Sequence, residues 1–263
     1  MNHDNWGSGD LYELFMGRWS RLTAVNFVQW LDAKPDLVWV DLGCGTGALT
    51  AVLQQHAKPR QIIGIDPSAT FVETAQMRHG NNITSFQVGD AAQIPLADDQ
   101  TDMLVSGLAL NFFLDASDAL IEMKRVVKPQ GTIAIYVWDY AGEMQFLRYF
   151  WDTAVSLNST ASTLDEGNRF PLCRPEPLRQ LFAGAGLQQI TVSPLDTITH
   201  FANFADYWQP FLGGVGPAPA YFASLNAIEQ EQFTQTLRDS LPFAEDGSLP
   251  LVARAWAVQG KRI

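Results

Sequence analysis

A glycine-rich turn directly after an apolar, acid-terminated segment is the part of this sequence best suited to hold a ligand. Residues 38–42 read Val-Trp-Val-Asp-Leu, and glycines follow at positions 43, 45 and 47. Glycine lets the backbone turn sharply or approach a ligand closely, because it has no Cβ to clash. A helix expected from Ala48 would direct its free N–H groups and its positive dipole end at this turn. The pattern predicts a cofactor site of the nucleotide-binding type.

Two cofactor classes fit this turn. The spacing Gly43-x-Gly45-x-x-Ala48 matches the loose dinucleotide fingerprint, in which the third glycine can be alanine. The tighter pattern is Asp-x-Gly-x-Gly-x-Gly, which begins at Asp41. A carboxylate at that position suits a ligand that carries an ammonium group and faces a pyrophosphate badly.

Further polar residues end the segments that we predict as neighbouring strands. Asp66 ends an apolar segment 25 residues after Asp41, where a carboxylate can accept hydrogen bonds from both hydroxyls of a ribose. Asp90 and Ser106 end the next two strand-like segments. Ligands of parallel sheets bind at the carboxyl ends of the strands, so these side chains are expected at one site.

The order of these motifs resembles that of the class I S-adenosylmethionine-dependent methyltransferases. Residues 41–47 look like their motif I, and Gly89-Asp90-Ala91-Ala92-Gln93-Ile94-Pro95-Leu96 looks like their Gly-Asp-Ala-x-x-Leu-Pro-Phe segment. Residues 101–106 resemble the family's fourth strand, and Val127-Lys128-Pro129-Gln130-Gly131 resembles its Leu-Lys-Pro-Gly-Gly turn. The resemblance covers roughly residues 36–138. It is nearest to the small-molecule branch that includes the ubiquinone and menaquinone C-methyltransferases (methyltransferase type 11).

The resemblance implies S-adenosylmethionine as cofactor and assigns residues to it. Asp66 would bind the ribose, Asp90 the adenine amine, and Arg18 the methionyl carboxylate, although Arg18 could equally be an ordinary solvated arginine. The other cofactor contacts that we expect are Asp41, Gly43, Cys44, Gly45, Gly47, Pro67, Ala91, Ser106 and Leu108.

Three residues are candidates for catalysis. Asn111 stands where many relatives carry histidine, and an amide cannot take up a proton at neutral pH. Tyr140 follows the predicted fifth strand, and His200 could act as a base or be structural. Asp139 could accept a proton or cap the next helix. Methyl transfer from a sulfonium requires mainly alignment and exclusion of water.

Composition limits the partners that we expect. The net charge of −11 disfavours nucleic acid and anionic membrane surfaces, because binding to phosphate needs clustered Lys and Arg. The first residues show no export signal, and no apolar run approaches the ~20 residues of a membrane span. Two distant cysteines suit a reducing cytoplasm. The four histidines show no metal-ligand spacing, so no metal is expected.

Alternating strand-like and helical segments predict an α/β fold. Strands are expected at 37–41, 61–65, 83–88, 102–106 and 131–138, with helices at 48–57, 68–79 and 116–126. Helices at 142–157 and 176–184 and a short strand at 187–192 follow. The resemblance implies that a last strand, 250–258, inserts antiparallel beside the fifth. The expected fold is a Rossmann-like, mostly parallel seven-stranded sheet with helices on both faces.

We expect three parts along the chain. Residues 1–35 would form an N-terminal helical segment over the cofactor, and residues 36–195 with 250–263 the Rossmann-like domain. Residues 196–249 would form a small helical lid rich in aromatic residues, or alternatively a helical hairpin packed on the sheet edge. Aromatic residues at 201–222, with Tyr140 and Asn111, would wall the acceptor pocket.

The leading functional hypothesis is transfer of a methyl group to a small, largely apolar molecule. A non-catalytic S-adenosylmethionine-binding protein and an NAD-dependent oxidoreductase remain as alternatives. The identity of the acceptor, the atom that is methylated and the oligomeric state stay open.

Overall fold

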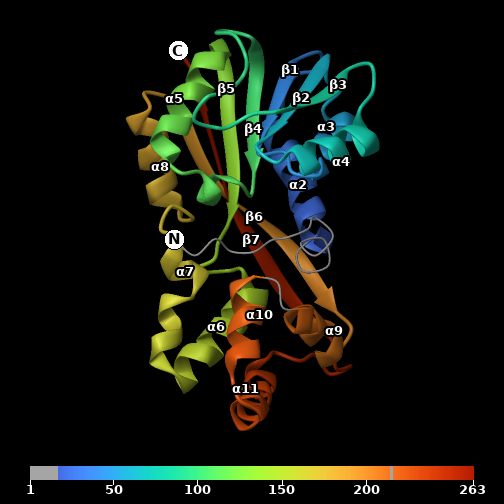
Figure 1. The fold of residues 1–263 in the computed structure, drawn as a ribbon, viewed down its shortest axis with the longest axis vertical. Helices are drawn as coiled ribbons and strands as arrows, with labels where there is room; N and C mark the ends of the chain where they lie inside the picture. The colour runs from blue at the N-terminus through green and yellow to red at the C-terminus, as the bar shows by residue number, and fades with distance from the viewer. Residues whose placement is uncertain (1–16, 214–215) are drawn as a thin grey trace. The chain divides into compact units, whose positions relative to one another are not determined.

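A computed structural model describes residues 17–213 and 216–263, and it contains a seven-stranded sheet of order β3-β2-β1-β4-β5-β7-β6 (Figure 1). The sheet is mostly parallel, and its last strand is antiparallel to the fifth, as we predicted. The strands are β1 (Val38–Leu42), β2 (Gln61–Asp66), β3 (Thr84–Val88), β4 (Thr101–Gly107), β5 (Val127–Trp138), β6 (Gln188–Phe201) and β7 (Leu249–Lys261).

Strand β1 lies in the middle of the parallel part. Val40 of β1 pairs with Ile63 of β2 on one side and with Leu104 of β4 on the other. All five residues of β1 are buried, which explains its nearly continuous apolar sequence. The chain leaves β1 toward β2 and later leaves β4 toward β5, so the direction of winding reverses between β1 and β4. Sheets of this kind bind ligands at such a switch point.

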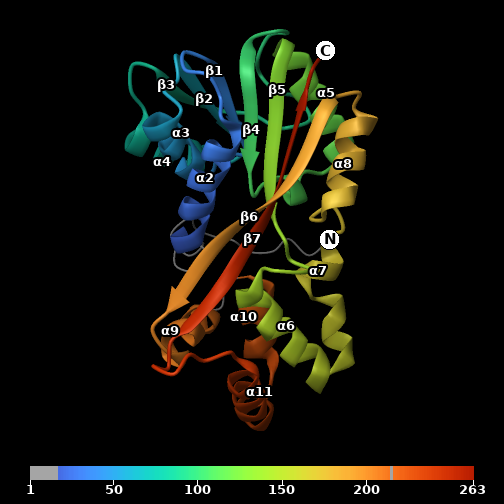
Figure 2. The same ribbon diagram turned by 180° about the vertical axis from the view of Figure 1, so that it is seen from behind.

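Helices precede, connect and follow the parallel strands. They are α2 (Arg18–Leu31), α3 (Ala48–His56), α4 (Ala69–His79), η2 (Leu110–Phe112), α5 (Ala116–Val126) and α8 (Pro175–Gly184). Right-handed crossovers place α3 and α5 on opposite faces, because their strands progress in opposite directions (Figure 2). Helix α5 begins where Asp115 accepts hydrogen bonds from the backbone of Ser117 and Asp118.

The last two strands differ from the prediction in length. The backbone N–H of Arg262 donates to the carbonyl of Gly131, and that of Asp139 donates to the carbonyl of Arg254. Residue numbers therefore rise along β5 as they fall along β7, as expected for an antiparallel pair. Strand β6, however, runs over Gln188–Phe201 and not only over 187–192. Its second half buries alternate residues, but two of these are Thr197 and Thr199. Threonine at inward positions hides the apolar alternation that signals a strand.

The contacts divide the described chain into two compact units. The sheet unit comprises residues 20–137, 172–195 and 255–263. The helical unit comprises residues 17–19, 138–171 and 196–254. Strands β5, β6 and β7 contribute residues to both units.

The helical unit has an aromatic core. Its helices are α6 (Gln145–Leu157), η3 (Ser159–Thr163), α7 (Glu166–Arg169), α9 (Phe204–Trp208), η4 (Gln209–Gly213), α10 (Pro217–Ser224) and α11 (Ala227–Ser240). Phe211 is 1% exposed and stacks on Phe146 and Phe150, with ring centroids 4.5 and 4.8 Å away. The hydroxyl of Tyr207 donates to the carbonyl of Phe146 over 2.9 Å. These aromatic side chains pack mainly on one another, and their expected place in the wall of an acceptor pocket stays a prediction.

Candidate functional site

The acid that precedes the glycine-rich loop is buried below it. Asp41 is 1% exposed, and its Oδ2 accepts a 2.6 Å hydrogen bond from the hydroxyl of Thr50 in the first turn of α3. Its Oδ1 has no partner among the described residues. Burial raises the pKa of Asp41 to about 7, the Thr50 bonds oppose this shift, and the charge of Asp66 adds to it.

The three glycines of the loop all adopt positive φ, at 72°, 53° and 90° for Gly43, Gly45 and Gly47. They differ in what surrounds them. A Cβ on Gly43 would lie 2.6 Å from the Cβ of Ala109, and one on Gly47 would lie 2.5 Å from the His79 ring. A Cβ on Gly45 would meet no atom within 4 Å. The loop is thus packed at both ends and open at its centre, where a ligand can approach the backbone.

The backbone N–H groups of this loop are already used. Gly43 and Cys44 both donate to the carbonyl of Ile65, Gly47 donates to the carbonyl of Cys44, and Gly45 donates to Asp66. These four amides are therefore not available to the phosphates of a dinucleotide.

Asp66 ends β2 and organises the loop. Its Oδ2 accepts from Gly45 and its Oδ1 from the backbone of Ser68, both over 2.9 Å. Burial raises its pKa, and the bonds from Ser68 and Gly45 oppose the shift. Each carboxylate oxygen has two lone pairs, so one acceptor position on each oxygen remains for ribose hydroxyls. Pro67, which follows, is exposed.

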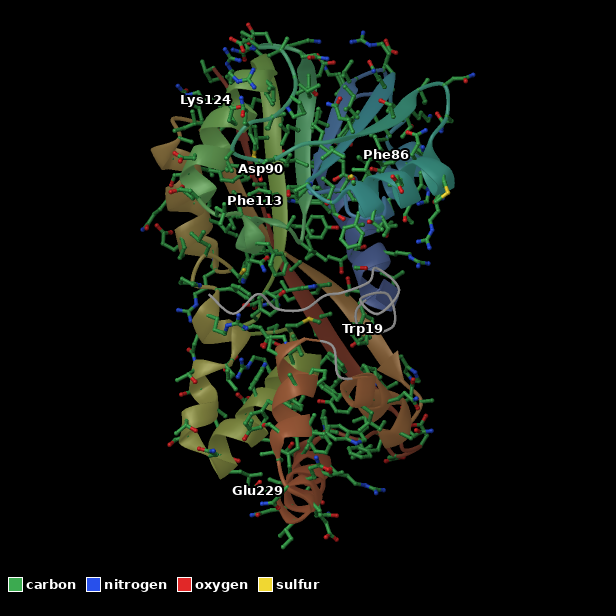
Figure 3. All side chains as sticks on the ribbon, in the orientation of Figure 1. Trp19, Phe86, Asp90, Phe113, Lys124 and Glu229 are labelled. Atoms are coloured by element: carbon green, nitrogen blue, oxygen red, sulfur yellow. The ribbon has the colours of Figure 1, made fainter. Side chains whose placement is uncertain are left out.

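Asp90 lies beyond the end of β3 and is exposed (Figure 3). Its Oδ1 accepts a 2.8 Å bond from the backbone of Ala92. The backbone of Gly89 donates to the carbonyl of Asp66, which ties this segment to the end of β2. Ala91 is half-buried. The structure therefore brings Asp66 and Asp90 to adjacent strand ends, as the motifs predicted.

Cys44 is not suited to act as a nucleophile. It is 6% exposed, and burial raises the pKa of its thiol, with further increases from the charges of Asp41 and Asp66. A raised pKa keeps the thiol protonated. Its role in the loop is packing against Gly64, where an added Cβ would lie only 3.1 Å from the sulfur.

The end of β4 leads into a turn with several unpaired polar atoms. Ser106 is fully buried, and its hydroxyl has no partner among the described residues. Leu108 adopts a φ of 59° and donates its N–H to the carbonyl of Tyr136. Both polar side-chain atoms of Asn111 are also buried and lack a partner within the described chain. Polar atoms left in this way are typical of a site that binds a ligand or water.

The other two catalytic candidates belong to the helical unit. Tyr140 is 8% exposed, its ring lies 5.3 Å from that of Phe170, and its carbonyl accepts from Arg148. His200 lies on the exposed face of β6. Asp139 accepts a bond from the backbone of Glu143 within the turn before α6, and because α6 begins at Gln145 with Met144 as its N-cap, the expected capping role is wrong. The side chain of Arg18 lies outside the described residues, so its predicted contact is not described.

Some residues at the site were missed by the sequence analysis. Thr50 binds Asp41, and His79 packs against Gly47. The spacing from Asp41 to Thr50 spans a loop and a helical turn, so only a capping analysis could have found this pair. Nothing in the sequence links His79 to Gly47, because their contact is between the ends of two helices.

A separate polar cluster stabilises the helical unit. Arg148 binds both oxygens of Asp165, at 2.8 and 2.9 Å, and Trp151 donates to the buried Glu166. Burial raises the pKa of Glu166 to about 7, an effect that the Trp151 bond opposes. We assign this cluster to stability, since Arg148 joins two segments of the unit.

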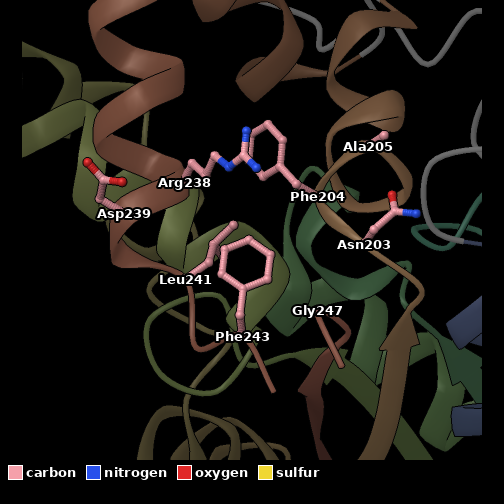
Figure 4. A pocket seen from close by; sticks show the side chains of 8 residues that line it. All are labelled: Asn203, Phe204, Ala205, Arg238, Asp239, Leu241, Phe243 and Gly247. Atoms are coloured by element: carbon pink, nitrogen blue, oxygen red, sulfur yellow. The ribbon is translucent and has the colours of Figure 1, made fainter. Parts of the chain in front are cut away.

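The helical unit also contains an open cavity of about 790 Å³ (Figure 4). The guanidinium of Arg238 lies 5.4 Å from the ring centroid of Phe204, and Leu241 and Phe243 line the same cavity. Of its lining residues, Phe204 is among the aromatic residues that the sequence analysis expected around the acceptor pocket.

The described part of the chain contains neither a membrane-crossing helix nor a cluster of metal-ligand side chains. No helix there has both the length and the apolar run that a bilayer crossing requires. No group of three or more His, Cys, Asp or Glu side chains there could hold a metal ion.

Comparisons with known proteins show what this chain is similar to. Residues 40–135 match the family model described as "Methyltransferase domain". A 2-phytyl-1,4-naphthoquinone methyltransferase of Trichormus variabilis is 31% identical over 45% of this chain and 54% of its own length. A ubiquinone/menaquinone biosynthesis C-methyltransferase of Desulfotalea psychrophila is 28% identical over 57% of this chain and 65% of its own length.

The matched regions are partial. The chain spans about half the length of the first curated relatives that it matches, between 50% and 65%. Among solved structures, the YcgJ protein of Bacillus subtilis superposes with a TM-score of 0.59 at 16% identity, covering 92% of this chain and 98% of that one. At that identity the likeness shows the fold alone.

Proposed function

Since this chain carries a class I methyltransferase domain that resembles the quinone C-methyltransferases, we propose that it transfers a methyl group from S-adenosylmethionine to a small, largely apolar molecule. The observation that carries the proposal is the loop of Gly43, Gly45 and Gly47. It is open at its centre, its amides are bonded within the protein, and carboxylates lie on either side of it.

The residues fit S-adenosylmethionine, which is the cofactor of this class. The remaining lone pairs of Asp66 suit a ribose, and the second oxygen of Asp90 suits an exocyclic amine. The unpaired Oδ1 of Asp41 and the hydroxyl of Ser106 suit a group with N–H donors. No phosphate has to be accommodated, which agrees with the absence of free amides at Gly43, Cys44, Gly45 and Gly47.

The cofactor supplies an already activated methyl group on a sulfonium sulfur. The protein then has to hold the acceptor in line with that group and keep water away. Asn111 can hydrogen-bond an acceptor but cannot take its proton at neutral pH. We therefore propose that an acidic acceptor proton passes to solvent and that Asn111 orients the acceptor.

The proposal of a small acceptor rests on charge and on the relatives. A net charge of −11 disfavours nucleic acid and suits a cytoplasmic enzyme that acts on free small molecules. Two relatives are named for methyltransfer in quinone biosynthesis, which is a small-molecule chemistry.

One observation favours a second candidate function, a protein that binds S-adenosylmethionine without catalysis. Asn111 offers no ionisable group where many relatives have histidine, and no other ionisable side chain of the turn 108–113 replaces it. The NAD-dependent alternative has no comparable support, because four of the loop amides are bonded within the protein.

Calorimetric titration with S-adenosylmethionine, S-adenosylhomocysteine and NADH tests the cofactor. We expect binding of the first two and none of NADH. Formation of S-adenosylhomocysteine is then measured with a panel of apolar phenols, hydroquinones and amines. Binding with no turnover on any acceptor would favour the non-catalytic candidate, and preferential binding of NADH would overturn both.

A further inference from the structure

The amide of Asn111 is an unusual feature of the sheet unit. Its Oδ1 and Nδ2 are both buried, and neither has a hydrogen-bond partner among the described residues. The oxygen and nitrogen of an amide are easily interchanged in a structure. That ambiguity has no effect here, because both atoms are unpaired. Buried polar groups without a partner destabilise a fold, so a pair on one side chain calls for a functional explanation.

The turn that carries Asn111 lies directly on the cofactor loop. The positive φ of Leu108 and its bond to Tyr136 turn the chain after β4. Ala109 then packs so closely on Gly43 that a Cβ built on Gly43 would lie 2.6 Å from the Cβ of Ala109. The same added Cβ would lie 3.8 Å from the ring of Phe113, which Figure 3 labels. Asn111 lies between these two contacts in the sequence. It is therefore close to the loop that we assign to S-adenosylmethionine.

The neighbours of Asn111 are apolar. Phe112 is 49% exposed and Leu114 is 91% exposed, while Leu110 is buried. Small-molecule sites are commonly apolar surfaces with a few polar groups that set orientation. An amide beside apolar side chains, of which Phe112 is partly exposed, fits that description.

We infer that Asn111 determines specificity for an aromatic acceptor with oxygen functions on two adjacent ring carbons, at least one of them a hydroxyl. This inference rests on the proposed function. A primary amide presents an N–H donor and a carbonyl acceptor side by side. One hydroxyl donates to the amide carbonyl, and the neighbouring oxygen accepts from the amide N–H.

Simpler acceptors match this amide less well. A single ketone leaves the amide carbonyl unpaired, and a single amine or hydroxyl satisfies only one of the two atoms. A carboxylate places negative charge beside the amide carbonyl. Asparagine also pairs in this two-point manner with the N6 and N7 atoms of adenine, so the adenine of the cofactor is the competing occupant.

Binding of three matched ligands in the presence of S-adenosylhomocysteine tests the inference. The probes are 2,3-dihydroxynaphthalene, 2-naphthol and 2,3-dimethoxynaphthalene, which share one ring system. We expect the wild-type protein to bind the diol about tenfold more tightly than 2-naphthol, the effect of one additional hydrogen bond, and the dimethoxy compound most weakly. Asn111→Leu should abolish the preference for the diol, because both ligands lose their bonds to the amide, and its loss of affinity should be larger for the diol than for 2-naphthol.

The variant also has a readout that needs no acceptor. Asn111→Leu should raise the Tm of the free protein, because it removes two buried unpaired atoms with little change in volume. Phe112→Leu is the matched control, because it changes an adjacent apolar contact and should keep the diol preference. A lower Tm for Asn111→Leu would indicate a structural role and overturn the inference.

Two other outcomes separate this inference from the proposed function. Equal affinity of the wild type for the diol and 2-naphthol overturns the inference while S-adenosylhomocysteine still binds. A loss of S-adenosylhomocysteine affinity in Asn111→Leu assigns the amide to the adenine and also overturns it. Failure of the wild type to bind S-adenosylhomocysteine at all removes the proposed function itself.

Discussion

The backbone N–H of Gly45 donates to the Oδ2 atom of Asp66 over 2.9 Å. The acid that ends β2 therefore holds the loop that follows β1. Asp66 combines this contact with its bond to Ser68, so one side chain fixes the shape of two adjacent strand ends. Asp66, which we expect to bind the ribose, therefore also holds the backbone around the expected ribose site in place.

Replacing Asp66 should weaken cofactor binding. Asp66→Asn keeps one acceptor oxygen for the loop but loses the negative charge and one acceptor position. We expect the Kd for S-adenosylmethionine to rise tenfold or more, because hydrogen bonds to charged groups contribute about 1.5–3 kcal/mol. Calorimetry gives the Kd, and circular dichroism checks the fold. Asp98→Asn, at an exposed residue that pairs with Arg125, is the matched control and should leave the Kd unchanged. An unchanged Kd in Asp66→Asn contradicts the assignment.

The buried carboxyl of Asp41 should make stability depend on pH. Its pKa is raised from 3.8 to about 7, so the folded protein keeps the proton over a range in which the unfolded chain releases it. Its contribution to the free energy of unfolding therefore falls as pH rises from about 4 to about 7, at roughly 1.3 kcal/mol per pH unit at most, and is constant above that. Asp41→Asn should remove this slope. Urea unfolding of both proteins at pH 5, 6, 7 and 8 checks the result, and parallel curves would show that Asp41 ionises normally.

Alanine substitutions at Gly47 and Gly45 should have different main effects, on stability and on cofactor affinity respectively. Gly47→Ala combines a φ of 90° with a contact to His79, so it should cost roughly 2–4 kcal/mol of stability. Gly45→Ala has open space around it and should cost only about 1 kcal/mol. Its methyl group, however, would project from the open side of the loop and lower cofactor affinity. Denaturation and calorimetry on both variants test this contrast, and it fails if Gly45→Ala binds the cofactor as tightly as the wild type.

Phe211 tests whether the aromatic residues of the helical unit form a core. Phe211→Ala removes a ring that stacks on Phe146 and Phe150, so it should cost about 3–5 kcal/mol of unfolding free energy. The adjacent Leu212 is 59% exposed, and Leu212→Ala should change stability by at most about 0.5 kcal/mol. Chemical denaturation of both variants provides the comparison. If Phe211→Ala changed turnover without changing stability, these aromatics would have a functional and not a core role.

The prediction of the parallel sheet succeeded because its signals are local. Each of the segments ending at Asp41 and Asp66 combines a buried apolar run with a terminal acid, and helices alternate with them at regular intervals. Burial on both faces requires such runs, so the pattern and the fold follow from one physical cause. The second half of β6 escaped prediction because Thr197 and Thr199 occupy its inward positions.

The sequence by itself determined the fold class, the methyltransferase resemblance and the placement of Asp66 and Asp90 at adjacent strand ends. Only the tertiary structure decided how the polar groups are used. It showed that the amides of Gly43, Cys44, Gly45 and Gly47 are occupied, that Asp41 is buried against Thr50, and that Asn111 has no partner among the described residues. Hydrogen bonding and burial depend on residues far apart in the chain, whereas apolar periodicity and glycine spacing act within a few residues.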